Sequence, residues 1–150
     1  MILVSTSALA TNKIYVTQAG ASLVFNVLQD GDGNKVGNST TASTASGSAT
    51  NFNIDQVGAS NLLTFDIHGD SFTGTFATTG NSNDIDFNCD SGDSTSGCDS
   101  ITASITFTGN SQNIDIDLAN TSSKSADGST VTILGQSGTD STVVAATIDG

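Results

Sequence analysis

The sequence contains no Glu, Arg, Pro or Trp. All 15 acidic residues are Asp, and the 3 basic residues are Lys13, Lys35 and Lys124. The absent Glu and Arg are good helix formers, whereas Ser, Thr, Gly, Asp and Asn, which together form more than half of the chain, favour turns, caps and strands. The composition therefore excludes a helix bundle.

The charge balance excludes two classes of partner. The formal net charge is -12, and three lysines cannot neutralise a run of phosphates. An anionic membrane surface is disfavoured for the same reason, and no apolar run approaches the length of a membrane span. We therefore expect neither nucleic-acid binding nor membrane insertion.

The N-terminal segment, residues 1–11, is mildly apolar and lacks the basic region of a classical signal peptide. We interpret it as a mature terminal segment that precedes a single domain, residues 12–150. We expect the protein to reach the extracellular side without a classical leader, or to travel on a virus particle.

The chain has an internal repeat with a fixed period of about 11 residues. Glycines recur at this step, as do apolar residues such as Ile54, Phe65, Phe76 and Phe87. Within each unit apolar and polar residues alternate, which is typical of a half-buried strand. The turn glycines are Gly20, Gly31, Gly58, Gly69, Gly80 and Gly109. The unit is thus a strand followed by a tight turn.

One such strand cannot bury its apolar face alone, but two facing strands can. The sequence predicts an all-β fold, a β-solenoid with two strands in each rung of about 22 residues and about five rungs. The inward, core-forming residues are expected to be Ile14, Val16, Phe25, Val27, Phe52, Ile54, Leu63, Phe65, Phe76, Ile85, Phe87, Ile105, Phe107, Ile116, Leu118 and Ile133.

Alternation between two sheets stacks each residue on the one two repeat units later. In residues 52–89, where the step is unbroken, this places Asp55 over Ala77, Asp66 over Asn88 and Thr64 over Asp86, which separates outward aspartates from like charges. Three stretches break the period: residues 36–50, 89–100 and 120–129. We interpret them as loops that leave one end of a rung, although residues 36–50 could contain a further strand.

The segment Gln29-Asp-Gly31-Asp-Gly33-Asn34 resembles the Gln-x-Gly-x-Gly-Asn core of curlin repeats, found in the amyloid subunits of bacterial curli fibres. Gln18-Ala-Gly20 and Gln56-Val-Gly58-Ala-Ser-Asn61 match it in part. The resemblance implies strand-turn-strand units in which inward amide side chains stack as hydrogen-bonded ladders. It implies this role for Gln18, Gln29, Gln56, Asn34 and Asn61. The chain departs from the family in its cysteine pair and its long insertions.

Cys89 and Cys98 are expected to form a disulfide, which indicates an oxidising, extracellular location. Asp30, Asp32 and Asn34 resemble the start of a calcium loop, but position 12 is Thr41 and not a bidentate Glu, so an EF-hand is excluded. Asp90, Asp93 and Asp99 could also converge on a cation. Calcium is thus a candidate cofactor, against the alternative that these residues only cap turns.

Catalysis is not expected. His68 is the only histidine and has no nucleophile at a recognisable spacing, so we interpret it as an ordinary surface residue. Asp84/Asp86 and Asp115/Asp117 follow from strand alternation and do not by themselves indicate a glycosidase pair. Thr-x-Thr segments suggest ice binding, but at the expected stacking step Thr75 would lie between Asn53 and Gly97, so no ladder is expected.

The sequence therefore predicts a non-enzymatic structural protein. We expect a subunit or decoration of an extracellular fibre or a virion appendage that associates with itself through exposed strand edges or with other fibre or virion proteins. The alternatives are a receptor- or glycan-binding adhesin module that uses the three loops and, more remotely, an ice-binding solenoid.

Overall fold

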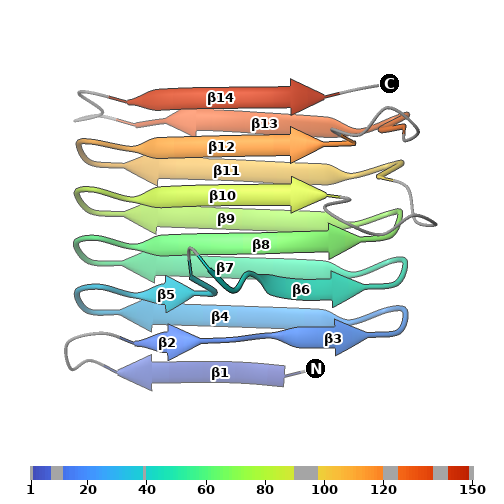
Figure 1. The fold of residues 1–150 in the computed structure, drawn as a ribbon. Coiled ribbons are helices and arrows are strands. Elements are labelled where there is room, and N and C mark those ends of the chain that lie inside the picture. Colours follow the sequence, from blue (N-terminus) through green and yellow to red (C-terminus); the bar gives the residue numbers. More distant parts are fainter. Residues whose placement is uncertain are drawn as a thin grey trace.

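The computed structural model describes residues 2–7, 12–38, 40–89, 98–119, 125–136 and 142–148. It contains two parallel sheets whose strands alternate along the chain, so that each rung contributes one level to each sheet (Figure 1). The chain begins and ends at opposite ends of the stack. The predicted all-β solenoid with two strands per rung is confirmed.

The first sheet, sheet A, has 6 strands and the second, sheet B, has 8. Two levels of sheet B are each made of two short strands, so the described chain forms six levels, slightly more than expected. Sheet A consists of β1 (Ile2–Ser7), β4 (Val24–Asp30), β7 (Asn51–Val57), β9 (Thr73–Thr79), β11 (Thr102–Thr108) and β13 (Thr130–Gly135). Sheet B consists of β2 (Lys13–Ile14), β3 (Thr17–Ala19), β5 (Lys35–Val36), β6 (Ser43–Ser46), β8 (Leu62–His68), β10 (Asp84–Cys89), β12 (Asn113–Leu118) and β14 (Val143–Ile148).

The strand register confirms the expected stacking step in the middle of the chain. Asp55 lies beside Ala77, Thr64 beside Asp86, and Asp66 beside Asn88. After Cys89 the insertion between β10 and β11 lengthens the step to 29 residues. The separation of like charges in residues 52–89 therefore does not continue beyond them, because Asp86 lies directly beside Asp115.

The insertion in residues 36–50 lies within a level of sheet B. β5 and β6 both pair with β8 and together form one level, which stacks on the level that β2 and β3 form below it. Between β5 and β6 the chain makes an excursion from the sheet, closed by an antiparallel bridge from Asn38 to Thr41. Residues 36–50 thus contain the strand β6, but it adds no half-rung and leaves the later sheet assignments unchanged.

The core lies between the two sheets and is built from the inward side chains. Of the residues expected there, Ile14, Val16 and Ile133 are only partly buried, and the others are buried. Phe72 is also buried, although it follows a turn and lies outside the apolar columns. Its ring fits because Gly74 has no side chain: a Cβ at Gly74 would overlap the rings of Phe72 and Phe76.

Five described turns follow a Gly-x-Ser pattern that we did not predict, and Cys98-Asp99-Ser100 has the serine without the glycine. At Gly80-Asn-Ser82 the glycine has φ +139 and the serine φ +60, so both lie in the region that L residues rarely adopt. Serines with positive φ are found at the same place in other turns: Ser22, Ser60, Ser71, Ser100 and Ser111. The repeated turn conformation lets successive rungs stack with their corners aligned.

Candidate functional site

A ladder of amide side chains runs through one corner of the solenoid. Asn12 donates to Asn34 at 3.2 Å, Asn34 to Asn61 at 3.2 Å, Asn61 to Asn83 at 3.0 Å, and Asn83 to Gln112 at 2.7 Å. Asn34, Asn61 and Asn83 also donate to the carbonyl of the glycine three residues earlier. The ladder therefore satisfies buried turn carbonyls and links five rungs.

A second, shorter ladder joins two glutamines. Gln56 Nε2 donates to Gln29 Oε1 at 2.8 Å, and both side chains are buried. Gln18, which the curlin resemblance placed in a ladder, is not part of one. Its neighbour on the next rung is Ala45, and its amide donates to the carbonyl of Gly20.

The sequence reading missed three members of the long ladder: Asn12, Asn83 and Gln112. Asn83 and Gln112 come three residues after Gly80 and Gly109, the same offset as Asn34 from Gly31 and Asn61 from Gly58. A ladder residue can therefore be recognised in the sequence by its position three residues after a turn glycine. The Gln that precedes the turn glycine in the curlin pattern is not required for a residue to join the ladder.

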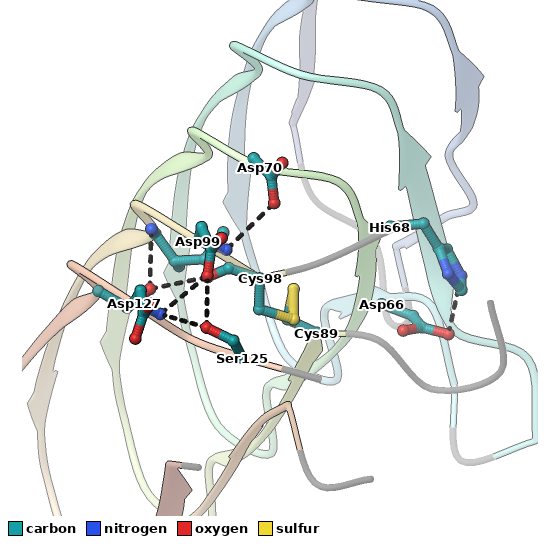
Figure 2. Close-up of a disulfide and its surroundings, with 10 residues drawn as sticks. Asp66, His68, Asp70, Cys89, Cys98, Asp99, Ser125 and Asp127 are labelled. Atoms are coloured by element: carbon teal, nitrogen blue, oxygen red, sulfur yellow. Dashed lines mark hydrogen bonds and ion pairs between the residues drawn. A yellow bond between two sulfur atoms is a disulfide. The ribbon is translucent and has the colours of Figure 1, made fainter. Parts of the chain in front are cut away.

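The corner that follows sheet B carries the disulfide between Cys89 and Cys98, with a Cα–Cα distance of 5.9 Å. This confirms the predicted pair. Beside it, aspartates cap successive turns: the Asp99 amide donates to Asp70 at 3.1 Å, and the Asp127 amide to Asp99 at 2.8 Å (Figure 2). Ser125 also donates to Asp99. Cys98 is thus joined covalently to β10, and Asp99 is held by hydrogen bonds at the turn.

Loss of the disulfide should lower stability without changing the fold of the other rungs. For a ring of this size the chain-entropy model gives about 2.5–3 kcal/mol. We expect Cys89→Ala/Cys98→Ala to lower the free energy of unfolding by up to that amount in urea titrations. Reductant should destabilise the parent chain and leave the double variant unchanged; an equal response of both would contradict this role.

The candidate calcium ligands do not form one site. Asn34 is buried in the amide ladder, and Asp32 accepts a hydrogen bond from the Ala59 amide. Asp90 and Asp93 lie outside the described residues. Among the residues that the structure describes, no group of three His, Cys, Asp or Glu side chains is placed to hold a metal ion. Asp32 and Asp99 instead accept hydrogen bonds from backbone amides at turns.

The outward face of sheet B is acidic. It carries Asp66, Asp84, Asp86, Asp115 and Asp117 on three neighbouring strands. Burial raises the pKa of Asp86 above its ordinary value of 3.8, and repulsion by Asp115, Asp84, Asp117 and Asp66 raises it further.

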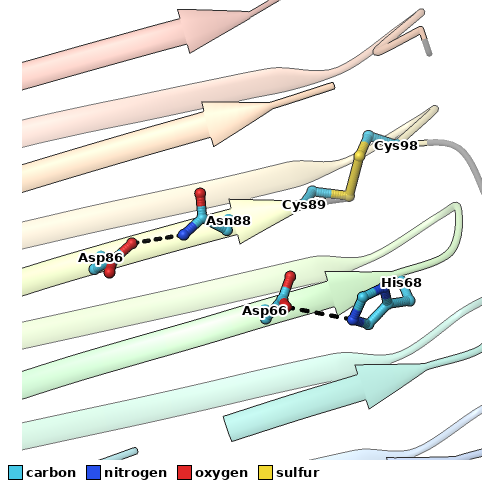
Figure 3. A network of polar contacts seen from close by, with 6 residues as sticks. All are labelled: Asp66, His68, Asp86, Asn88, Cys89 and Cys98. Atoms are coloured by element: carbon cyan, nitrogen blue, oxygen red, sulfur yellow. Dashed lines mark hydrogen bonds and ion pairs between the residues drawn. A yellow bond between two sulfur atoms is a disulfide. The ribbon is translucent and has the colours of Figure 1, made fainter. Parts of the chain in front are cut away.

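Two polar contacts hold side chains on this face. Asn88 donates to Asp86 at 2.8 Å, and His68 pairs with Asp66 at 3.3 Å (Figure 3). His68 is therefore a partly buried side chain with a carboxylate partner, and not the ordinary surface residue that we expected.

Removing the charge of Asp86 should stabilise the protein at neutral pH. A raised pKa in the folded state means that ionised Asp86 opposes folding above that pKa and ceases to do so below 3.8. Because solvent screens this half-exposed group, we expect Asp86→Asn to raise the free energy of unfolding by only about 0.5 kcal/mol at pH 7. The gain should vanish as the pH falls toward 3.8.

A matched control is Asp55→Asn, because Asp55 lies between the uncharged Leu28 and Ala77. Each variant removes one negative charge, so only Asp86→Asn should gain stability through lost local repulsion. Urea titrations between acidic and neutral pH measure this difference. Equal gains from both variants would show that the local repulsion is unimportant.

The C-terminal end of the solenoid, formed by β13 and β14, leaves the apolar columns uncovered. Val144 continues the column of Ile114, and Ile148 that of Leu118. Ile114 and Leu118 are 1% and 0% exposed, whereas Val144 and Ile148 are 47% and 49% exposed. β13 and β14 end their sheets, so each pairs with a described strand on one side only. We call this surface the C-terminal open end.

The described residues include no helix that is long and apolar enough to cross a membrane. Comparison with known proteins finds no matching family model, no matching curated protein and no matching solved structure.

Proposed function

We propose that this chain is a non-enzymatic structural subunit of an extracellular fibre or virion appendage that stacks on copies of itself. The observation that carries the proposal is the C-terminal open end, where apolar columns buried in the inner rungs end half-exposed at Val144 and Ile148. A further rung placed on β13 and β14 would bury them and pair their free backbone groups.

The charges favour head-to-tail stacking over stacking of like ends. Lys13 and Lys35, two of the 3 basic residues, lie side by side on β2 and β5 near the N-terminal end of sheet B. Asp115 and Asp117 lie on β12, next to β14 at the other end. Joining opposite ends brings basic and acidic regions toward each other and keeps the strands parallel. Joining two N-terminal ends would bring lysines together.

The amide ladders and the disulfide support the same role. Stacked amide side chains are the feature shared with curlin repeats, and they stabilise a regular stack of rungs. A disulfide suits an oxidising environment outside the cell. We therefore propose an extracellular or virion-surface location.

Assembly should depend on the inward side chains of β14. We expect the parent chain to form larger species as its concentration rises, and Val144→Lys/Ile148→Lys to remain monomeric, because lysines would have to be buried between rungs. The control is Val143→Lys/Thr147→Lys, which places the same charges on the outward side of the same strand. Sedimentation velocity measures the outcome. A parent chain that stays monomeric, or equal loss in both variants, would overturn the proposal.

The second candidate is a receptor- or glycan-binding module. It is favoured by the insertions β10–β11 and β12–β13, which leave the same corner on successive rungs. The excursion between β5 and β6 instead lies within a level of sheet B, so the three insertions do not share one rim. For this reason we favour the structural role.

A further inference from the structure

The outward side of sheet A carries columns of hydroxyl groups on β9, β11 and β13. Thr73, Thr102 and Thr130 form one column, and Thr75, Ser104 and Thr132 form the next. Thr106 and Thr108 add further hydroxyl groups along β11. We call the outward side chains of these three strands and the residue after β13 the hydroxyl face. Its members are Thr73, Thr75, Ala77, Thr79, Thr102, Ser104, Thr106, Thr108, Thr130, Thr132, Leu134 and Gln136.

This array corrects the sequence-based expectation that no threonine ladder exists. With the step of the middle rungs Thr75 would have stacked on Gly97. The step across this junction is longer because of the insertion between β10 and β11, and it places Ser104 beside Thr75. The neighbour on the other side is Asn53, as expected. The insertion therefore brings the hydroxyl columns into register.

The hydroxyl face carries no charge, although the chain has 15 Asp. The outward side chains of sheet B on the same rungs include Asp84, Asp86, Asp115 and Asp117. Charged groups hold water in their own hydration shells, whereas hydroxyls and methyls do not impose such a shell. The contrast indicates that the hydroxyl face suits an uncharged ligand.

The spacing of the array is set by the backbone. Neighbouring strands lie about 4.8 Å apart, and alternate residues of a strand about 6.6 Å apart. The spacing between strands lies close to the shorter repeat of water molecules on a prism face of hexagonal ice. The χ1 angle of threonine is stiff, so its hydroxyl and methyl groups keep a defined direction. Successive strands of the sheet run nearly parallel in Figure 1, so the outward side chains repeat from strand to strand in the same direction.

We propose that the hydroxyl face binds ice, its threonine columns holding a layer of ordered water that joins the crystal lattice. The ligand is crystalline water, and the binding surface is distinct from the ends of the solenoid that we propose for assembly. Ice binding therefore does not depend on the proposed structural role, and either can fail alone.

Partition of the protein into a slowly grown ice crystal tests the proposal. We expect the disulfide-bonded parent chain to enter the ice, and Thr102→Tyr or Thr75→Tyr to lose most of this partition, because a bulky ring on the hydroxyl face holds the neighbouring hydroxyls away from the crystal. Both positions are exposed, so the fold should tolerate the rings. The control is Asn113→Tyr, at an exposed outward position of β12 in sheet B.

Three results would overturn the proposal. The parent chain could be excluded from ice, or the control could lose as much partition as the two face variants. Sedimentation could also show that the parent chain pairs through this face and that Thr102→Tyr separates the pair, which would assign the face to a second copy. Continued head-to-tail assembly of Thr102→Tyr would show that the structural proposal stands independently.

Discussion

Gly109→Ala is expected to destabilise the protein by about 4 kcal/mol or more, lowering its melting temperature by roughly 8–16 °C. Gly109 has φ +119, and a Cβ there would overlap the carbonyl of Gly80 on the preceding rung. That carbonyl belongs to backbone held by its own ladder contacts, so it cannot move aside without shifting a whole turn. The close approach of successive turns therefore requires glycine at this position.

The matched control is Gly20→Ala. Gly20 has a similar φ of +114, but a Cβ there would meet only the Gln18 side chain, at 3.8 Å. Its cost should be limited to backbone strain, about 1–2 kcal/mol. Thermal unfolding of both variants separates the two effects. Equal losses of stability would show that strain alone matters and that rung contact does not.

Asn61→Leu should be nearly as damaging, with an expected loss of about 3 kcal/mol or more in the free energy of unfolding. Asn61 is buried at the centre of the amide ladder. Leucine removes the donor to Gly58 O at 2.8 Å and to Asn83 Oδ1 at 3.0 Å, and the acceptor for Asn34 Nδ2. Asn34 and Asn83 are buried, so water does not readily replace the partner that each of them would lose.

Asn53→Leu is the comparison for this variant. Asn53 is an exposed, outward residue of β7, with Asn26 and Thr75 as its neighbours. The substitution should change the free energy of unfolding by no more than about 0.5 kcal/mol. Urea titration measures both variants. A small effect of Asn61→Leu would mean that the ladder contributes little and that the apolar columns alone hold the rungs together.

The fold could be predicted because individual apolar residues recur along the sequence at a fixed spacing. Ile54, Phe65, Phe76 and Phe87 indicate the two-sheet arrangement without further information, and Phe65 does lie beside Phe87 in sheet B. Strand alternation has a period of two, so an unbroken repeat determines both the inward face and the stacking partner. This is why the expected neighbours of the outward residues Asp55, Thr64 and Asp66 were correct.

The features that could not be predicted depend on where inserted residues leave the stack. A count of residues could not show that an excursion interrupts a level of sheet B, or how far the β10–β11 insertion shifts the register. The Asp86–Asp115 pair and the hydroxyl face both result from that shift. The ladder residue Gln112 and the turn residue Ser82 could have been predicted from their distance to the turn glycine. The curlin pattern instead emphasises the Gln before that glycine, which these two turns lack.

The most direct test of the central claim is the axial repeat of the native assembly, measured by electron microscopy of the disulfide-bonded protein. Each sheet has six levels. At a spacing of about 4.8 Å per level, the six described levels are roughly 29 Å long. We expect thin filaments, or appendages on a particle, whose strands are perpendicular to the axis and recur every ~4.8 Å along it. Monomers at every concentration, or an assembly whose repeat does not match stacked solenoids, would contradict it.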